Sequence, residues 1–338
     1  MTKSRTWQKI FIAVTVAFAV LLMCITVLSH LGRVSRSFEL LSHFRVQYSL
    51  LFFVAAVVLA FCRAWKWGML PLMGFLLNFV PVAYYWLPAE KSDFRGEKNQ
   101  KVRILVSNVF AINKRYKPLR EHIRRYQPDI IGLVEVTSRW LKKLGPATRS
   151  YPHRYTLPRK DGFGLALYSK YPLGGFQKLN VGGVSVPTLV AKVALPTGVF
   201  TFVLVHLHPP KSEQFFKWRN TQLSHLAALT ASSSIPVVLA GDLNTSMWSP
   251  YYRDFVSKGK LNNARKGFGL YPTWPMNSLW SWPRNPLLCV PIDHVLYTGE
   301  IHTRSFRSLG YIGSDHLPIL TDLVFKKAKS DSRWIGLK

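Results

Sequence analysis

The feature that most constrains this chain is an uninterrupted apolar stretch near its N-terminus. From Ile10 to Leu28 all 19 residues are apolar or Thr. As a helix they would extend for about 30 Å, which is the thickness of the hydrocarbon core of a bilayer. A secretory signal peptide is the alternative, because basic residues precede the stretch, but the hydrophobic region of such a peptide has only about 7 to 15 residues. We therefore expect a retained membrane-spanning helix over residues 8–30.

Two further apolar segments follow at 46–62 and 67–87, separated only by the sequence "RAWK". Their proximity predicts a helical hairpin, so that the chain would contain about three transmembrane helices. The second span is short, and a re-entrant or interfacial helix is the alternative there. We expect an N-terminal membrane domain over residues 1–90 and a polar linker over 91–100.

The basic residues beside the predicted spans bear on membrane orientation. Five of them would share the side of the N-terminus, namely Lys3, Arg5, Lys9, Arg63 and Lys66. Three would lie on the opposite side, namely Arg33, Arg36 and Arg45. This excess favours a cytoplasmic N-terminus, and three spans would then place the rest of the chain outside the cytoplasm. The basic residues of the linker (Lys91, Arg95 and Lys98) oppose that orientation.

The remainder of the chain is strongly basic. From residue 101 to the C-terminus there are 34 Lys and Arg against 12 Asp and Glu, a net charge of +22. Solubility alone does not require so large a charge, so an acidic partner is indicated. Nucleic acid, anionic lipid head groups and soluble polyphosphates all fit, and charge does not choose among them. We expect a folded domain over 101–326 and a basic tail over 327–338.

Short runs rich in apolar and β-branched residues predict the strands of this domain. They lie at 102–107, 130–134, 163–169, 187–195, 199–206, 236–241, 292–297 and 317–325. Apolar residues at helical spacing predict helices at 117–127 and 212–233. Many strands are apolar on both faces, which is typical of sheets that are covered on both sides. The pattern predicts a layered α/β sandwich.

Acidic residues are scarce in this domain, so their positions carry information. Glu135, Asp242, Asp293 and Asp315 each lie at or near the end of a predicted strand. A single carboxylate beside a glycine would most simply cap a turn, but four together indicate a site. Amides and imidazoles accompany them, namely Asn108, Asn244, His206, His294 and His316.

These side-chain types predict a site for a divalent cation and a phosphate group. Mg²⁺ (or Mn²⁺) prefers oxygen ligands, commonly one or two carboxylates together with waters and substrate phosphate. A structural zinc site would need several Cys or closely spaced His, and Cys289 is the one cysteine after the apolar segments.

The order of these motifs resembles the endonuclease/exonuclease/phosphatase (DNase I-like) superfamily. The motifs are "SN" at 107–108, "E" at 135, "GDLN" at 241–244, "IDH" at 292–294 and "GSDH" at 313–316. The superfamily includes DNase I, the abasic-site endonucleases, the inositol polyphosphate phosphatases and the neutral sphingomyelinases. The resemblance covers about residues 101–325 and implies a four-layer α/β sandwich of two packed mixed β-sheets flanked by helices.

The N-terminal spans and the sequence "YPTWP" at 271–275 look closer to a bacterial membrane-anchored subgroup typified by the YafD-like proteins. That resemblance implies a multi-pass protein of the bacterial inner membrane. With the orientation predicted above, its basic domain would lie in the periplasm.

The resemblance also implies roles for individual residues. Glu135 is similar to the principal Mg²⁺ ligand of the family, with Asn108 beside it to help hold metal or phosphate. Asp242 and Asn244 match the pair that orients or deprotonates the attacking water and binds the phosphate.

The histidines of the motifs are the expected proton carriers. His316 matches the catalytic histidine of the family, and Asp315 matches the carboxylate that holds it and fixes its tautomer. His206 corresponds to a further functional histidine. Asp293 is expected to support the metal ligands or His206.

The segment 270–291 is unusual because it contains three Trp and five Pro. This proline density predicts an irregular loop that borders the site. The indoles of Trp274, Trp280 and Trp282 could stack on nucleic-acid bases, enter the membrane interface, or pack as a small core of their own.

The leading hypothesis is a membrane-anchored, Mg²⁺-dependent phosphodiesterase that acts on nucleic acid, as an endonuclease or an exonuclease. The alternative substrate is a phospholipid, cleaved by a sphingomyelinase-like phosphodiesterase or phosphatase. A catalytically inactive binding module is the alternative from another class, but it would be expected to lack Glu135, Asp242 or His316. The sequence indicates a lipid bilayer around the spans and identifies no protein partner.

Overall fold

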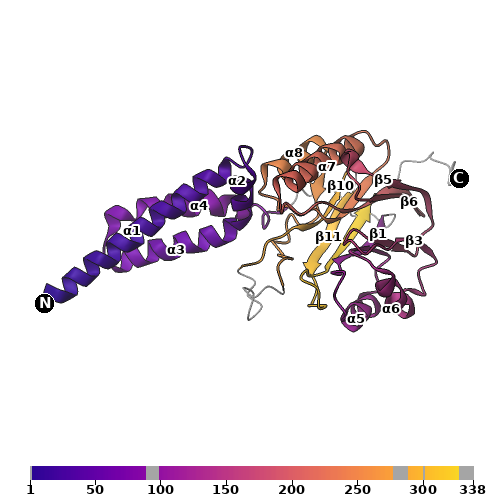
Figure 1. The fold of residues 1–338 in the computed structure, drawn as a ribbon, viewed down its shortest axis with the longest axis horizontal. Coiled ribbons are helices and arrows are strands. Elements are labelled where there is room, and N and C mark those ends of the chain that lie inside the picture. The colour runs from indigo at the N-terminus through magenta and orange to yellow at the C-terminus, as the bar shows by residue number, and fades with distance from the viewer. Residues whose placement is uncertain (1, 89–98, 277–287, 300, 327–338) are drawn as a thin grey trace. The chain divides into compact units, whose positions relative to one another are not determined.

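The computed structural model describes residues 2–88, 99–276, 288–299 and 301–326 (Figure 1). The chain divides into two compact units, one formed by Met1–Leu87 with Trp248–Pro250 and the other by Pro88–Met247 with Tyr251–Lys338. Each unit is described by itself. The predicted tail at 327–338 and most of the predicted linker at 91–100 lie outside the described residues.

The first unit is a bundle of apolar helices. Its helices are α1 (Thr2–His30), α2 (Arg36–Leu41), α3 (Arg45–Phe61) and α4 (Met69–Ala83). Together with short 3-10 turns they make three helical stretches long and apolar enough to cross a membrane, at Arg5–His30, Arg36–Phe61 and Trp65–Ala83. This confirms the prediction of three apolar helices of spanning length.

A polar contact joins all three stretches of this bundle. The side-chain amide nitrogen of Asn78 on α4 donates to Thr26 Oγ1 on α1 at 3.1 Å, and its oxygen accepts from Arg45 Nη1 at 3.4 Å. Small residues allow close packing beside it, since a Cβ on Gly74 would come within 2.3 Å of the Phe52 ring. Close packing at small residues and interhelical hydrogen bonds are typical of helices that associate in lipid.

The second unit contains two six-stranded mixed sheets. The first sheet has the order β11-β12-β1-β2-β4-β3. Its strands are β1 (Gln100–Asn108), β2 (Ile130–Val134), β3 (His153–Leu157), β4 (Leu165–Ser169), β11 (Ile301–Ser308) and β12 (Ile319–Phe325). β1 and β2 are parallel, and the other pairs are antiparallel.

The second sheet has the order β5-β6-β7-β8-β10-β9. Its strands are β5 (Leu173–Leu179), β6 (Thr188–Leu195), β7 (Gly198–His206), β8 (Val237–Asp242), β9 (Asn262–Asn263) and β10 (Asp293–Tyr297). β7 and β8 are parallel, and the other pairs are antiparallel.

Helices cover the outer faces of the two sheets. α5 (Lys117–Tyr126) and α6 (Ser138–Thr148) lie on one side of the unit, and α7 (Glu213–Ala231) and α8 (Pro250–Lys258) lie on the other (Figure 1). The predicted four-layer sandwich is therefore confirmed.

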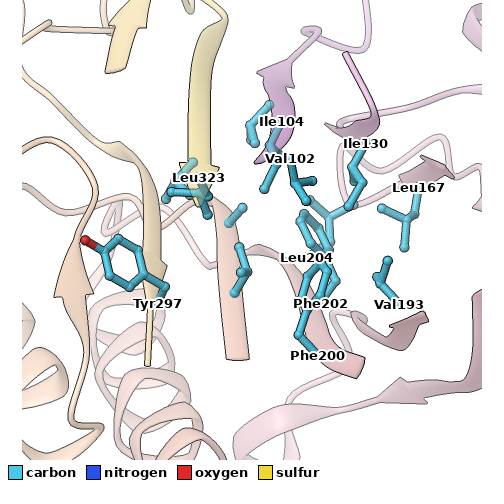
Figure 2. Close-up of a cluster of buried hydrophobic side chains, with 14 of the residues drawn as sticks. Val102, Ile104, Ile130, Leu167, Val193, Phe200, Phe202, Leu204, Tyr297 and Leu323 are labelled. Carbon is cyan, nitrogen blue, oxygen red and sulfur yellow. The ribbon is translucent and has the colours of Figure 1, made fainter. Parts of the chain in front are cut away.

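Alternation along the strands explains how the sheets are buried on both faces. Val102 and Ile104 of β1 point into the core between the sheets, where they meet residues such as Phe202 and Leu204 of β7 (Figure 2). Leu105, on the opposite face of β1, packs in the separate core under α5 and α6. Successive side chains of a strand point to opposite faces, so strands in this position must be apolar throughout.

Several elements were not predicted from the sequence. These are helices α6 and α8 and strands β3, β5, β9 and β11. The signal for α6 is present, because Thr137 Oγ1 caps it by accepting from Trp140 N and its buried residues recur at helical spacing, but Gly145 and Pro146 obscure the pattern. β3 and β5 are edge strands with largely exposed or half-buried side chains, so they lack the apolar runs of the central strands.

Candidate active site

The ends of four strands bring the predicted site residues to one edge of the sandwich. Asn108 is the last residue of β1, and Glu135 directly follows its parallel neighbour β2. In the second sheet, His206 and Asp242 are the last residues of parallel strands β7 and β8 and pair with each other in register. Carboxyl ends of parallel strands lie at the same edge of a sheet, and this edge is where α/β folds place functional groups.

An antiparallel strand and a loop complete the site. β10 runs opposite to β8, so Asp293 at its start is the register partner of Asp242. The loop before β12 is fastened by Ser314, whose hydroxyl donates to the Asn108 carbonyl at 2.8 Å and accepts from the His316 N–H at 3.0 Å. Ser314 belongs to the "GSDH" motif, but nothing in the motif indicates this positioning role.

Unusual backbone conformations occur in this edge. Glu135 and Asn244 have positive φ angles of 61° and 49°, a region that side-chain-bearing residues rarely adopt. Gly241 has a φ of 137°, and a Cβ there would lie 1.9 Å from the Val205 carbonyl oxygen. The glycine of "GDLN" is therefore needed for the close approach of β7 and β8, immediately before the carboxylate of Asp242.

Asn108 aligns two of the carboxylates. Its Nδ2 donates to Glu135 Oε1 at 2.9 Å and to Asp242 Oδ2 at 3.1 Å. Its Oδ1 accepts from the Phe110 N–H at 3.0 Å. Since the amide turns both of its N–H groups toward carboxylates, this orientation suits a group that aligns Glu135 and Asp242. The role of Asn108 in holding metal or phosphate stays a prediction.

His316 is held by Asp293, which corrects the sequence-based assignment of its partner. His316 Nδ1 lies 2.8 Å from Asp293 Oδ2, so Nδ1 carries a proton and Nε2 faces Asp242 Oδ2 at 3.6 Å. The prediction that Asp315 holds His316 is wrong. Adjacent residues of the loop point in different directions, and one Asp315 oxygen accepts instead from Trp274 Nε1 at 3.3 Å.

The buried carboxylates and imidazole shift one another's pKa values. Burial, and then the negative charge of Asp293, raise the pKa of Asp242 to about 6. Burial also opposes the ionisation of Asp293, but the attraction of His316 outweighs it and lowers the pKa of Asp293. For His316 the burial penalty is outweighed by Asp293 and then Asp242, which together raise its pKa. The arrangement thus favours an imidazolium at His316 against an ionised Asp293, with Asp242 as the group able to take up a proton.

His206 faces the same carboxylates from the second sheet. Its Nδ1 lies 3.0 Å from the carbonyl oxygen of Gly162, which places a proton on Nδ1. Its Nε2 lies 3.6 Å from Asp242 Oδ2 and 4.0 Å from Glu135 Oε1. Both predicted histidines therefore direct Nε2 toward the carboxylates.

Asn244 is fixed by contacts that the sequence did not suggest. Its N–H donates to Asp242 Oδ1 and its Nδ2 donates to the Leu207 carbonyl, both at 2.8 Å. The fully buried Arg219 of α7 donates from Nη1 to the Asn244 carbonyl at 3.0 Å. No motif pointed to Arg219, because an arginine on an amphipathic helix is usually exposed.

The side chains of the site offer ligand atoms to a metal ion. One ligand atom each from Asp242, Asp293 and His316 lie within 4.8 Å of one another among the described residues. Glu135 adds a carboxylate next to Asp242, bridged by the Asn108 amide. A cation would stabilise the buried carboxylate of Asp242, whose pKa is raised by burial and by Asp293, and oxygen-rich donor sets suit Mg²⁺ or Mn²⁺. The residues therefore fit a hard divalent ion, and Asp293 joins the predicted ligands.

The Trp- and Pro-rich loop borders the site, at least over its described part. Thr273 Oγ1 accepts from the backbone N–H of Asp293 at 3.3 Å, and the Met276 N–H donates to the Asp315 carbonyl at 2.8 Å. Trp274 contacts the Asp315 carboxylate as given above. Trp280 and Trp282 lie outside the described residues.

A family model for the "Endonuclease/Exonuclease/phosphatase family" matches residues 105–316, which include every motif of the site. The chain belongs to this family. The predicted superfamily is thereby confirmed. None of the curated proteins compared with the sequence matches it.

Solved structures show the same fold at low sequence identity. A family protein from Bacteroides thetaiotaomicron has a TM-score of 0.56 and 18% identity, over 70% of this chain and 99% of its own. D. rerio TDP2 complexed with single strand DNA product has a TM-score of 0.54 and 16% identity, over 66% and 99%. A mannosyl-6-phosphatase from Bacteroides thetaiotaomicron has a TM-score of 0.53 and 19% identity, over 66% and 100%.

Proposed function

We propose that this protein is a membrane-anchored, metal-dependent phosphodiesterase that acts on nucleic acid. The observation that carries the proposal is the convergence of Glu135, Asp242, Asp293, His206 and His316 at one edge of a basic sandwich of this family. A catalytically inactive module is disfavoured, because these groups are not only present but assembled within contact distance.

The proposed roles follow from the contacts. Glu135 and Asp293 would hold the Mg²⁺ or Mn²⁺ ion, which supplies charge stabilisation to the phosphoryl group. Asp242, with its raised pKa, accepts a proton from the attacking water. His316, protonated on Nδ1 against Asp293, contacts a phosphate oxygen or the leaving group through Nε2.

The groups around this centre would bind the phosphate. Asn108 would contribute its side-chain amide, His206 would add a second imidazole, and Asn244 shapes the loop that follows Asp242. Asp315 would act on the site through its charge and through Trp274, rather than by holding His316.

Two observations favour nucleic acid as the substrate. The chain from residue 101 carries a net charge of +22, which suits a polyanion. One fold neighbour is a TDP2 with a single strand DNA product. A phospholipid or small phosphomonoester is the second candidate, favoured by the apolar helices of the first unit and by the mannosyl-6-phosphatase among the neighbours.

We further propose that residues 1–90 anchor the protein in a bacterial inner membrane, as in the YafD-like subgroup, with residues 101–326 as a periplasmic catalytic domain. The three helices of spanning length support the anchor. The five-to-three excess of basic residues on the N-terminal side supports the orientation.

The test is a side-by-side assay of the full chain in detergent micelles, with Mg²⁺ or Mn²⁺, on single-stranded DNA, duplex DNA, RNA, phospholipid vesicles and bis(p-nitrophenyl) phosphate. We expect cleavage of a nucleic acid and of the chromogenic diester, both abolished by EDTA. Glu135→Gln should raise the metal concentration needed for half-maximal rate, and His316→Ala should reduce turnover by about 10²- to 10⁴-fold. Activity that persists in excess chelator would contradict the metal mechanism, and head-group release without cleavage of any nucleic acid would replace the substrate.

A further inference from the structure

A row of aromatic rings extends outward from His206, and the proposed chemistry does not use it. Phe163 lies next to His206, with ring centroids 5.0 Å apart, and next to His208 at 5.2 Å. His208 in turn contacts Phe215 at 5.2 Å and Trp218 at 5.0 Å. The rings therefore form a continuous series that begins at a histidine 3.6 Å from the Asp242 carboxylate.

The rings are held in place by their local structure. Phe215 and Trp218 are three residues apart in the first turns of α7, and their rings stack at 5.3 Å with an angle of 25°. Ser212 caps that helix by accepting from the Phe215 N–H at 3.2 Å. His208 is buried, and its Nδ1 lies 3.1 Å from the Gln222 side-chain oxygen. It therefore forms a fixed support for the rings of Phe215 and Trp218. Such a surface requires little ordering when a ligand binds.

The degree of exposure of the rings indicates what they can bind. Phe163, Phe215 and Trp218 are each partly exposed, so they offer ring surface without projecting into solvent. In the second unit the large apolar side chains that project most are elsewhere, for example Ile112 at 73% exposed. A surface that inserts into a membrane would need projecting apolar side chains, whereas flat, half-buried rings suit stacking.

Positive charge accompanies the rings. Exposed Lys160 precedes Phe163, and exposed Lys211 precedes α7. Aromatic rings beside cations along one path are the combination that binds single-stranded nucleic acid, because bases stack on the rings while the cations follow the phosphates. In a duplex the faces of the bases are occupied by their neighbours in the stack, so a duplex cannot use such a surface without being opened.

We propose that Phe163, Phe215 and Trp218 form a stacking surface for the unpaired bases of a single-stranded polynucleotide whose scissile phosphate lies at the carboxylate cluster. This rests on the proposed function, since it names the substrate class of the same site. It assigns to these three residues a role in binding that is separate from the chemistry at Asp242 and His316.

The test compares two oligonucleotides that differ only in their bases. Fluorescently labelled oligothymidylate and an abasic oligonucleotide of the same length carry the same phosphates. Their affinities for the full chain in detergent micelles are measured by fluorescence anisotropy in EDTA, so that no cleavage occurs. Because the electrostatic contribution is shared, the ratio of the two affinities reports stacking. We expect oligothymidylate to bind tighter by about five- to 150-fold for each base that stacks.

Substitutions of the rings show whether they cause the difference in affinity between the two oligonucleotides. Phe215→Leu and Trp218→Leu should each reduce this ratio toward one, while the conservative Trp218→Phe should retain most of it. Phe176→Leu is the matched control, because Phe176 also lies in a stacked aromatic pair, with Tyr155 at 4.8 Å, but on edge strand β5 away from the site. Its ratio should equal that of the wild type. Thermal unfolding of each variant verifies that it is folded.

Equal affinity of the wild type for the two oligonucleotides, or binding of neither, would overturn the stacking surface. So would variants that slow hydrolysis of phospholipid vesicles while keeping the wild-type affinity ratio, which would assign the rings to lipid. Failure of the proposed hydrolase activity looks different: no metal-dependent cleavage of any substrate would be seen, whatever the affinity ratio.

Discussion

The side chain of His316 lies between two buried carboxylates, and only one of them fixes its tautomer. Asp293 Oδ2 is 2.8 Å from Nδ1, whereas Asp242 Oδ2 is 3.6 Å from Nε2. A carboxylate at Nδ1 keeps the imidazole in one orientation and stabilises its charged form, in the manner of the orienting Asp of a catalytic triad. Asp315, although adjacent in sequence, directs its carboxylate to Trp274.

This geometry predicts different effects for the two aspartates. Asp293→Asn should reduce kcat by about 10²- to 10⁴-fold, because the amide cannot stabilise an imidazolium or hold a cation as the carboxylate does. Asp315→Asn is the matched control and should reduce kcat by less than about tenfold, since it leaves the tautomer of His316 unchanged. Steady-state kinetics on bis(p-nitrophenyl) phosphate with saturating Mg²⁺ give both values. A larger loss in Asp315→Asn than in Asp293→Asn would show that the partner of His316 differs in the working enzyme.

At the residue scale, the sequence could identify which side chains form the site but not how they pair. Glu135, Asp242 and His316 were predicted from scarce acids and from motif order, and the structure places them together. Asp293 takes the contact with His316 that was expected of Asp315, because the pairing depends on side-chain directions in a loop. Arg219 and Ser314 act on the backbone of the site, and backbone-fixing contacts leave no distinctive pattern in a single sequence.

An ion-pair cluster around the buried carboxylate of Asp322 joins the neighbouring strands β1 and β12 of the first sheet. Arg103 of β1 donates to both oxygens of Asp322 on β12, from Nε at 2.7 Å and Nη2 at 3.0 Å, and Lys101 Nζ lies 3.2 Å away. Burial alone would raise the pKa of Asp322, but the hydrogen bonds from Arg103 and then Lys101 outweigh it and lower this pKa. A two-point Arg–carboxylate contact is the strong form of such a pair.

The lowered pKa predicts an acid-dependent contribution to stability. A carboxyl whose pKa is lower when folded stabilises the fold above its unfolded pKa, near 3.9, and loses that contribution as the pH falls through the folded value. Asp322→Asn should therefore lower the free energy of unfolding at pH 7 by about 1.5–3 kcal/mol and make stability less sensitive to pH below about 4. Thermal unfolding of the full chain in detergent micelles at pH 7 and pH 3 measures this.

Asp161 provides the control for that experiment. It forms an ion pair with Arg159, but its side chain is 47% exposed in a loop. Exposed pairs contribute about 0–1 kcal/mol, so Asp161→Asn should change stability much less than Asp322→Asn. Equal losses in the two variants would mean that the β1–β12 cluster is not a special source of stability.

At the scale of elements, burial on both faces is what made the central strands predictable. β2, β7 and β8 are largely apolar along their length, and β1 is apolar at Val102 and from Ile104 to Val106, because one face meets the other sheet and the other meets helices. The edge strands β3 and β5 lack this requirement, so their sequences carry no comparable pattern. The close approach of β7 and β8 at Gly241 is likewise a property of two strands together, which neither strand reveals by itself.

The whole molecule combines three apolar helices with a basic unit of the endonuclease/exonuclease/phosphatase family. Both parts could be predicted from the sequence, because their signals extend over many residues. Hydrophobic length predicts spanning helices, and the ordered motifs predict the sandwich. The side of the membrane on which the basic unit lies is harder to predict, since it depends on a small difference in flanking charge.

Membrane orientation can be tested at two positions with opposite expected outcomes. If the N-terminus is cytoplasmic and all three stretches span the membrane, the turn between α3 and α4 is cytoplasmic and the C-terminus is periplasmic. Alkaline phosphatase fused after Lys338 should then be active, and green fluorescent protein at that position should be dark. Fusions made after Ala64 should show the reverse. A re-entrant segment at 46–62 would instead place Ala64 in the periplasm and Lys338 in the cytoplasm, so both pairs of reporters would be reversed. A fluorescent fusion after Lys338 would return the basic unit to the cytoplasm, where its nucleic-acid substrates would be the cell's own.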